Sequence, residues 1–306
     1  MIHIVCNLCG RDDWHVRFPV TMTDPDSLNV DAYRCTSSSY GSHAQIVQCN
    51  HCGYVYANPR WPSEALIQAY TAVEDEVYER EREGRELTFQ KHLQAMEKIR
   101  GENKRGRILD VGAYIGVFVE VARQRGWEAW GLEPSAWAAQ AAHQRGLNII
   151  EGTLESPTLQ GQTFDVITLW DVIEHVDDPY SELARAFQLL TPGGMVVVHT
   201  MDIDSWMARL MGARWPWLMD MHIHYFSQKT LAQMLEKIGY RVIWSGAQGR
   251  YLRLGYVASR VEGLSPFLGK LFRRVVYGLR LDRLAIPLNF GDLFTVYAIR
   301  PEKGSG

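Results

Sequence analysis

The sequence has no hydrophobic run long enough to cross a membrane as a helix, since none reaches the ~18 to 20 apolar residues that a bilayer requires. Residues 1–9 also lack the basic stretch followed by an apolar stretch that is typical of a secretory signal. A net charge of -3 and an isoelectric point near 6.4 exclude an overall basic surface for nucleic acid. These absences predict a cytoplasmic protein and argue against nucleic acid as its partner.

Cysteine is scarce, and all five cysteines lie among the first sixty residues. Four of them form two Cys-x-x-Cys pairs, Cys6 with Cys9 and Cys49 with Cys52, and a glycine follows each pair. In a reducing compartment this spacing favours metal over disulfides. Four thiolates close a tetrahedral site for structural Zn²⁺ and leave no position for a catalytic water. Free or redox-active thiols are the alternative, and we expect Cys35, outside both pairs, to be an ordinary thiol.

The composition, 46% hydrophobic and 22% charged residues, excludes a disordered or fibrous chain. The 306 residues are enough for one large core and a small additional module. Two prolines within 58–62 interrupt the pattern, so we predict a zinc ribbon at 1–60, a helical linker or cap at 61–105 and the main domain at 106–306.

Beyond Gly106 the chain alternates short β-branched runs with segments that suit helices. The runs are 107–111, 128–133, 147–151, 164–170, 195–200, 240–245 and 294–300. Strands connected by helices form parallel sheets with helices on both faces. The sequence therefore predicts an α/β fold with a doubly wound, mostly parallel seven-stranded sheet, in which 294–300 lies near an edge.

A glycine-containing turn follows the first of these strands. The strand contains Asp110, and the turn contains Gly112 and Gly116 before a predicted helix. Such a turn lets the backbone approach a ligand closely, and the amino end of the helix adds favourable dipoles. Glu133, at the end of the next strand, stands where an acid accepts the hydroxyls of a ribose. A plain tight turn is the alternative for each glycine.

The dinucleotide fingerprint Gly-x-Gly-x-x-Gly is incomplete here, because Tyr114 and Val117 stand at its second and third glycine positions. An acid two residues before the first glycine instead resembles the first motif of class I S-adenosylmethionine-dependent methyltransferases, Asp-x-Gly-x-Gly-x-Gly. Three further segments resemble motifs of that family: 131–135, 164–179 and 189–194. With cysteine pairs in front, the chain is similar to methyltransferases of sugar and polysaccharide pathways, including zinc-containing deoxysugar C-methyltransferases.

The resemblance implies S-adenosylmethionine as the cofactor and assigns residues to it. By this resemblance Asp110, Gly112 and Gly116 shape the pocket for the amino-acid end, Glu133 binds the ribose, Thr153 and Leu154 lie near the adenine, and Asp171 lies beneath the cofactor.

A general base is needed where the methyl acceptor is a hydroxyl or a carbon acid, and histidine suits this task near neutral pH. His222 and His224 alternate with hydrophobic residues after the fifth strand, so we expect both rings to face the same way. We predict His224 as the base, with His222 and Tyr225 as its partners; a loop anchored by hydrogen bonds is the alternative. Glu174 and His175 hold either a loop or a divalent ion.

Aromatic residues and methionines are concentrated within 201–226, which we interpret as a substrate lid or as ordinary hydrophobic cover. In the first case Arg209 and Arg214 meet an acidic group of the substrate, such as a diphosphate. His199, on a predicted strand, is expected in the core or the pocket wall.

A basic amphipathic helix is predicted over 264–280, with Ser265 as its cap and Pro266 as its first residue. The surrounding segment, 250–287, carries eight basic and two acidic side chains in a chain whose total charge is -3. Packing of the apolar stripe on the main domain is the favoured interpretation. Peripheral contact with an anionic membrane is the alternative.

These features together predict methyl transfer from S-adenosylmethionine to a small polar acceptor, a sugar or a sugar conjugate. A zinc-ribbon RNA methyltransferase and a non-catalytic protein that binds the cofactor or a partner are the alternative hypotheses. The charge balance of the chain argues against RNA.

Overall fold

Three β-sheets and the helices around them form the part of the chain that the computed structural model describes, residues 1–22, 30–34, 40–75, 78, 82–101 and 104–302. Cys35, predicted to be an ordinary thiol, lies outside the described residues. No helix of the described residues is long and apolar enough to cross a membrane.

The largest sheet has seven strands in the order β10-β13-β8-β7-β4-β5-β6. Its consecutive parallel strands are β4 (Arg107–Val111), β5 (Glu128–Glu133), β6 (Asn148–Glu151), β7 (Phe164–Trp170) and β8 (Leu190–Met201). β13 (Leu293–Ile299) runs antiparallel to both of its neighbours, β8 and β10 (Arg241–Ala247), and lies one strand in from the edge. This arrangement confirms the predicted mostly parallel seven-stranded sheet.

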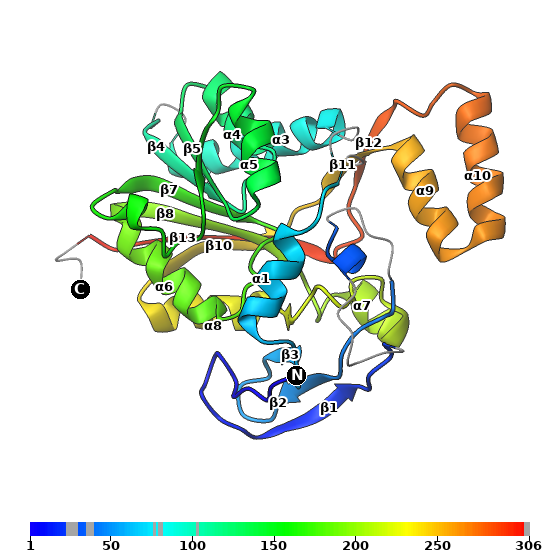
Figure 1. The fold of residues 1–306 in the computed structure, drawn as a ribbon, viewed down its shortest axis with the longest axis horizontal. Helices are drawn as coiled ribbons and strands as arrows, with labels where there is room; N and C mark the ends of the chain where they lie inside the picture. Colours follow the sequence, from blue (N-terminus) through cyan, green and yellow to red (C-terminus); the bar gives the residue numbers. More distant parts are fainter. Residues whose placement is uncertain (23–29, 35–39, 76–77, 79–81, 102–103, 303–306) are drawn as a thin grey trace.

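Helices cover both faces of this sheet (Figure 1). One face carries α3 (Arg82–Arg100), α4 (Val117–Gln124) and α5 (Ala136–His143), and the other carries α6 (Pro179–Leu189) and α8 (Gln228–Ile238). A separate hydrophobic cluster fills each interface, because a parallel strand is buried on both sides. The helix starts are encoded locally: Asp178 accepts hydrogen bonds from two amides at the start of α6, and Ser227 caps α8.

Parallel strands end at the same edge of a sheet, and the chain order reverses between β4 and β7. In doubly wound folds the crevice beyond the strand ends at such a reversal is where ligands bind. The fold therefore brings the ends of β4, β5, β7 and β8 together around one place.

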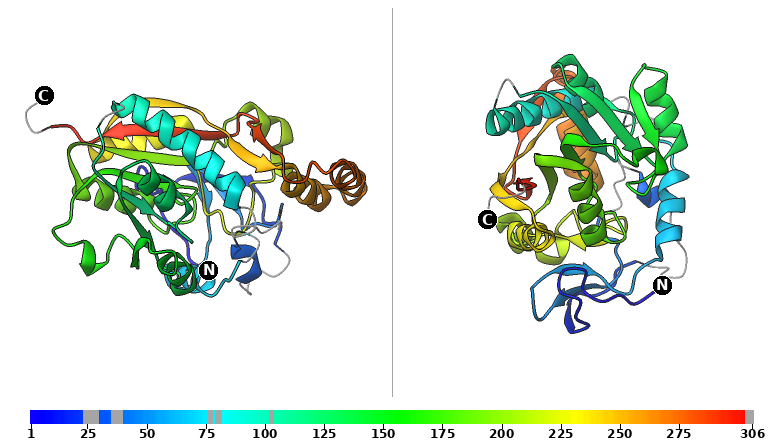
Figure 2. Two further views of the ribbon diagram at one scale, coloured as in Figure 1. Left: turned by 90° about the horizontal axis from the view of Figure 1, so that it is seen from above. Right: turned by 90° about the vertical axis from the view of Figure 1, so that its left-hand side faces the viewer.

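A second, four-stranded antiparallel sheet contains the amino-terminal segment. Its strands are β1 (Trp14–Phe18), β2 (Ile46–Cys49), β3 (Val55–Ala57) and β9 (His224–Tyr225), in that order. In β9, Tyr225 pairs with Val55 and His224 pairs with Tyr56. The amino-terminal sheet is thus completed by a strand from the segment that follows β8, and Figure 2 shows this sheet beneath the larger one.

The chain also forms several shorter elements. They are α1 (Ser63–Thr71), α7 (Trp206–Met211), the 3-10 helices Val30–Tyr33, Pro157–Leu159 and Gly212–Arg214, and a two-stranded sheet of β11 (Arg250–Arg253) and β12 (Ala285–Leu288).

Between β11 and β12 the chain forms a helical hairpin, α9 (Leu254–Leu264) and α10 (Pro266–Gly278), which stands clear of the large sheet (Figures 1 and 2). Pro266 is the first residue of α10, as predicted, but the Ser265 side chain makes no capping hydrogen bond. The apolar stripe of α10 is exposed, with Phe267 79% and Leu279 64% accessible. The favoured prediction, that this stripe packs on the main domain, is therefore wrong.

Candidate active site

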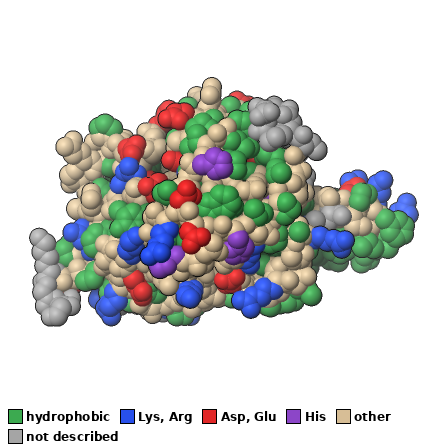
Figure 3. Space-filling view, turned by 90° about the horizontal axis from the view of Figure 1, so that it is seen from below, with side chains coloured by type: hydrophobic (Ala, Val, Ile, Leu, Met, Phe, Trp, Pro, Cys, Tyr) green, Lys and Arg blue, Asp and Glu red, His purple; other side chains and the backbone are tan. Residues whose placement is uncertain are grey.

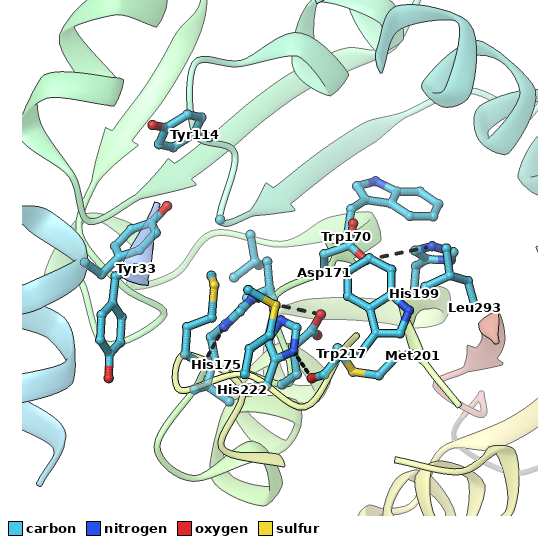
Figure 4. Close-up of a pocket in the computed structure, with 18 of the residues that line it drawn as sticks. Tyr33, Tyr114, Trp170, Asp171, His175, His199, Met201, Trp217, His222 and Leu293 are labelled. Carbon is cyan, nitrogen blue, oxygen red and sulfur yellow. Dashed lines mark hydrogen bonds and ion pairs between the residues drawn. The ribbon is translucent and has the colours of Figure 1, made fainter. Parts of the chain in front are cut away.

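A cavity of about 760 Å³ opens at the carboxyl ends of the parallel strands. Its wall contains residues at or just beyond four strand ends: Val111 and Gly112 for β4, Leu132 and Pro134 for β5, Trp170 and Asp171 for β7, and His199 and Met201 for β8. A volume of this size lies within the range of ~300 to 1,000 Å³ that is usual for small-molecule sites. The cavity is therefore the candidate active site (Figure 4).

The turn after β4 forms one end of the cavity and needs a backbone that few residues adopt. Gly112 has a φ of 69°, and a β-carbon at this position would lie 2.5 Å from Cγ2 of Val172. Gly116 has a φ of 78°. Tyr114, the departure from the glycine pattern, adopts the same left-handed region with a φ of 48°. The turn thus keeps its shape without the middle glycine.

Glu133 holds this turn in place. Its carboxylate accepts hydrogen bonds from the amides of Tyr114 and Ser135, both at 2.8 Å, and from the hydroxyl of Tyr70 at 3.4 Å. Burial raises the pKa of Glu133 to about 7 despite these donors. Its neighbours Leu132 and Pro134 line the cavity, whereas the carboxylate lies behind Tyr114 in the wall.

Asp110 lies deeper in the same wall. It is 4% exposed and accepts a hydrogen bond of 2.7 Å from the hydroxyl of Thr168 on β7. Burial raises the pKa of Asp110 to about 8, and the nearby Glu133 adds to the shift. The acid therefore links β4 to β7 at the base of the turn.

Asp171, just after β7, carries negative charge into the cavity. Burial acts to raise its pKa, but the positive charge of Arg250 and, to a smaller extent, the interaction with His199 outweigh burial and hold the pKa below its usual value. Arg250, on β11, forms an ion pair with Asp171, and Nε2 of His199 lies 3.8 Å from the same carboxylate. This pair joins the sheet to the segment that leads into the α9–α10 hairpin.

His175 and His222 lie side by side in the cavity, with ring centres 4.9 Å apart (Figure 4). Nδ1 of His175 donates to the carbonyl oxygen of Met221 at 2.8 Å, and Nδ1 of His222 donates to that of Trp217 at 2.7 Å. In a neutral imidazole these bonds leave the lone pair on Nε2. Burial lowers the pKa of His222 to about 3 and also lowers that of His175, so both rings are neutral bases at physiological pH.

Glu174 supports the two histidines from behind. Its carboxylate accepts a hydrogen bond of 2.9 Å from Thr200, and its carbonyl oxygen accepts the amides of Ile223 and His224 at 3.0 and 3.1 Å. Burial raises the pKa of Glu174 to about 8, and the charge of Asp171 adds to the shift. Ligand atoms of Glu174, His175 and His222 lie within 4.8 Å of one another. The backbone bonds are those of the predicted loop anchor, and this donor set is also compatible with a cation.

His224 and Tyr225 lie elsewhere. Both are 0% exposed, and neither is among the described residues that line the cavity. The ring of His224 stacks on Tyr54 with a centroid distance of 5.8 Å, and the hydroxyl of Tyr225 donates to the carbonyl oxygen of Met219 at 3.3 Å. The expectation that His222 and His224 face the same way is wrong, because His224 belongs to β9 and is held by β3, whereas His222 precedes the strand in a turn.

Comparison with known proteins decides the family. Residues 78–244, more than half of the chain, match the family model described as a methyltransferase domain. The chain belongs to the methyltransferase domain family. The described fold, with its seven-stranded sheet, is that of S-adenosylmethionine-dependent methyltransferases. The ends of β4, β5, β7 and β8 at the cavity lie within the matched residues, whereas the lining residues before 78 and from Arg250 onward lie outside them.

Individual relatives cover less of the chain. One is the ubiquinone biosynthesis O-methyltransferase of Cronobacter sakazakii (strain ATCC BAA-894), which is 34% identical over 118 residues, 36% of this chain and 49% of that protein. Another is the ubiquinone biosynthesis O-methyltransferase of Serratia proteamaculans (strain 568), which is 32% identical over 117 residues, 35% of this chain and 48% of that protein. The chain thus spans about half the length of the curated relatives it matches. The structure of the plantazolicin methyltransferase BpumL in complex with SAH aligns with a TM-score of 0.52 and 17% identity over 78% of this chain and 95% of that one, which shows the shared fold.

The cavity of the methyltransferase domain contains only some of the residues that we predicted for the cofactor. Gly112, Thr153 and Asp171 line it, whereas Asp110, Gly116, Glu133 and Leu154 are buried and are not among the described lining residues. The strand ends used for the prediction meet at the cavity, but strand ends alone do not say which side chains point inward, and cofactor binding by these residues stays a prediction.

Several cavity residues were not predicted from the sequence. Tyr70 and Tyr78 come from the segment before the sheet, and the arginines among the described lining residues are Arg85, Arg185, Arg250, Arg253 and Arg260. The excess of basic residues within 250–287 was a partial signal for the last three of these arginines. Arg209 and Arg214, predicted to meet an acidic group, are exposed and are not among the described lining residues.

The four paired cysteines form a cluster beside the methyltransferase domain. Sγ of Cys6 lies 3.5 Å from that of Cys52, and Sγ of Cys9 lies 3.5 Å from that of Cys49; all four atoms lie within 4.8 Å of one another. A disulfide needs about 2.05 Å, whereas zinc–sulfur bonds of 2.3 Å give tetrahedral edges of about 3.8 Å. The cluster is therefore consistent with a zinc ribbon.

The glycines after the two cysteine pairs adopt the left-handed backbone conformation of a tight turn. Gly10 and Gly53 have φ values of 78° and 77°, and their amides donate to the carbonyl oxygens of Cys6 and Cys49. This geometry closes each turn so that both thiols of a pair point to one place.

Proposed function

We propose that this protein transfers the methyl group of S-adenosylmethionine to a nucleophilic oxygen or carbon of a small polar acceptor, a sugar or a sugar conjugate. The observation that carries the proposal is the cavity itself. It joins the glycine-containing turn, where a cofactor binds in this fold, to His222, whose Nε2 carries a lone pair.

Residues at one end of the cavity would hold the cofactor. Gly112 allows close approach at the turn, and Glu133 lies behind Tyr114, within reach of ribose hydroxyls if its bond of 3.4 Å to Tyr70 opens. Thr153 lies beside the place expected for the adenine, and the negative charge of Asp171 favours a cationic sulfonium. When bound, S-adenosylmethionine supplies an electrophilic methyl group on that sulfonium.

The chain itself contributes position and a base. Methyl transfer breaks the sulfur–carbon bond, forms a bond from carbon to the acceptor and leaves a neutral thioether, so the acceptor must lose a proton. Nε2 of His222 would take that proton. A base of low pKa is sufficient for a hydroxyl acceptor, because the oxygen becomes strongly acidic as the methyl group attaches. His175, whose ring lies beside that of His222, would orient the acceptor.

Cations from β11 and α9 support an anionic acceptor. Arg250, Arg253 and Arg260 line the cavity, and Arg85, which also lines it, stacks on Tyr78, whose ring contacts Tyr114 of the glycine-containing turn. Guanidinium groups bind phosphate through paired hydrogen bonds. An acceptor that carries phosphate, such as a nucleotide-linked sugar, suits these cations better than a neutral one.

The cysteine cluster would bind Zn²⁺ in a structural role, because four thiolates fill a tetrahedral site and leave no ligand position for substrate. The ubiquinone biosynthesis O-methyltransferases found by comparison support methyl transfer to a small molecule, and the arginines point to a charged acceptor.

Calorimetry with S-adenosylmethionine, followed by mass spectrometry of a phosphorylated sugar pool incubated with methyl-labelled cofactor, tests the proposal. We expect binding, and labelled methyl in a sugar product. Glu133→Ala should weaken binding by about 10- to 100-fold, the usual loss of a charged hydrogen bond. Glu151→Ala is the matched control, since Glu151 is paired with Glu133 in the sheet register but is exposed.

Absence of binding would leave only the non-catalytic hypothesis. Binding followed by labelling of RNA, and not of the sugar pool, would favour the zinc-ribbon RNA methyltransferase.

A further inference from the structure

α10 has three distinct sides along its length. Gly269 and Val276, seven residues apart, face α9, and a β-carbon on Gly269 would lie 2.1 Å from Cα of Glu262. The hairpin is also held by an ion pair of 3.3 Å between Arg273 of α10 and Glu262 of α9. A second side of α10 is apolar, and a third, which contains Lys270 and Arg274 besides Arg273, is basic.

The apolar side is formed by Phe267, Leu268, Leu271, Val275 and Leu279, which we call the apolar face of α10. These side chains are 79%, 56%, 56%, 49% and 64% exposed. They recur at intervals of three and four residues, so they form one stripe along the helix. Contiguous exposed apolar patches mark interaction sites, because their exposure to water is otherwise unfavourable.

Cations border this face. Lys270 and Arg274 follow Phe267 by three and seven residues, so they lie along its edge, and both are exposed. Over residues 266–284 the chain has five basic side chains and one acidic side chain. The partner must therefore be apolar where it meets the stripe and anionic around it.

We propose that the apolar face of α10 binds the surface of an anionic membrane, with the helix lying in the plane of the interface. Acyl chains would cover Phe267, Leu271 and Val275, and lipid phosphates would meet Lys270 and Arg274. A second copy of this chain fits less well, because two such faces in contact would bring their bordering cations together.

The shape of the molecule agrees with this partner. The hairpin stands clear of the large sheet, and the space-filling view shows hydrophobic and basic side chains together on the protruding lobe (Figures 1 and 3). A flat surface can therefore reach α10 without displacing other elements. Arg250 to Arg253 and two residues of α9, Tyr256 and Arg260, line the cavity, so membrane binding would hold the cavity close to the interface.

Sedimentation of the full chain with vesicles tests the proposal. One set contains phosphatidylcholine alone, and the other also contains phosphatidylglycerol. We expect binding to the anionic vesicles and little to the neutral ones. The double variant Leu271→Ser/Val275→Ser should lose roughly tenfold or more in affinity, because it removes the apolar contact. Lys270→Glu/Arg274→Glu should lose binding and its dependence on salt.

Leu210→Ser is the matched control, since Leu210 on α7 is 74% exposed and lies outside the hairpin. All the substituted side chains are exposed, so thermal unfolding should be unchanged. The proposal is overturned if the wild-type chain does not bind anionic vesicles at low salt, or if the Leu271→Ser/Val275→Ser variant binds them as wild type does. It is also overturned if light scattering shows a dimer that the same variant dissociates, which would identify a second copy as the occupant.

Discussion

His222 and His224 are identical side chains two residues apart, yet they lie in different surroundings. His222 lies in the cavity, with Nδ1 held by a carbonyl oxygen and the lone pair on Nε2. His224 is enclosed by Tyr54 and Phe226, and its Nε2 donates to the carbonyl oxygen of Asp177 at 3.2 Å. Burial lowers the pKa of both histidines to about 3, so the pKa does not distinguish a base from a structural residue. Their positions do distinguish them, because of the two only His222 lines the cavity.

We predict that His222→Ala lowers kcat for methyl transfer by about 10²- to 10⁴-fold, the usual contribution of a general base. Binding of S-adenosylmethionine should change little, because the glycine-containing turn is at the other end of the cavity. Single-turnover transfer and calorimetry on the same variant separate the two effects.

His224→Gln is the comparison variant. It should lower the melting temperature, since the side chain anchors β9, but keep kcat within about tenfold of wild type. The prediction that His224 is the base would be supported if this variant lost transfer while His222→Ala kept it.

At the scale of elements, the amino-terminal segment with the four paired cysteines, which we call the cysteine module, holds the loop that follows β7. Arg60 forms an ion pair with Asp177, Asn7 donates to Asp178 at 3.1 Å, and Lys237 of α8 donates to the carbonyl oxygen of Leu8. The same loop carries Glu174 and His175. The module is therefore connected to His175 through this loop, and Tyr33 and Tyr40 of the amino-terminal segment also line the cavity.

We predict that Cys49→Ala abolishes stoichiometric Zn²⁺ binding and lowers the melting temperature by about 5 to 10 °C, because metal binding stabilises only the folded module. Methyl transfer should fall more than cofactor affinity, since the loop with His175 loses its support. Metal analysis, thermal unfolding and kinetics measure the three effects.

Cys35→Ser is the control, because Cys35 is outside both pairs; it should keep the metal. Equal metal content in Cys49→Ala and wild type would contradict a four-thiolate site.

At the scale of the whole molecule, buried titratable groups make stability depend on pH in two opposing ways. Burial raises the pKa of Asp110 and of Glu174 to about 8, whereas that of an unfolded carboxyl is near 4. Between these values the folded state keeps protons that the unfolded state releases, so rising pH lowers the free energy of unfolding. His199, His222 and His224, with pKa values lowered to about 3, act in the opposite direction, but only below about pH 6.5.

From pH 6.5 to 8 only the carboxyl effect remains among these groups. We predict that the free energy of unfolding falls over this range by about 2 kcal/mol for each of the two carboxyls. Urea unfolding at both pH values measures the change. Asp110→Asn should remove the share of Asp110 from the fall of the unfolding free energy with pH, because the amide cannot titrate. An unchanged dependence on pH in this variant would disprove the raised pKa of Asp110.

Local patterns made much of the fold predictable. The runs at 107–111, 128–133 and 164–170 correspond to β4, β5 and β7, because a buried parallel strand needs a short β-branched segment whatever surrounds it. The turn with Gly112 and the paired cysteines were recognisable for a similar reason. Each requires particular residues at a fixed spacing within one stretch of chain.

The roles of the two histidines were not predictable in this way. The alternation of His222 and His224 with hydrophobic residues suggested that both rings face the same way, but only His224 and Tyr225 are in β9, and their direction is set by pairing with β3 from the amino-terminal segment. No residue pattern near His222 indicates the pairing between β9 and β3.

By itself the sequence determined the order of strands and helices, the turn at the end of β4 and the two Cys-x-x-Cys pairs, because these depend on interactions between residues close together in the chain. Only the tertiary structure decided that His222 and not His224 lies in the cavity, that Arg250 and Arg260 rather than Arg209 and Arg214 line it, and that the apolar face of α10 remains exposed. These outcomes depend on which distant segments meet. The free energy of such contacts comes from burial and pairing between elements, which no single stretch of sequence specifies.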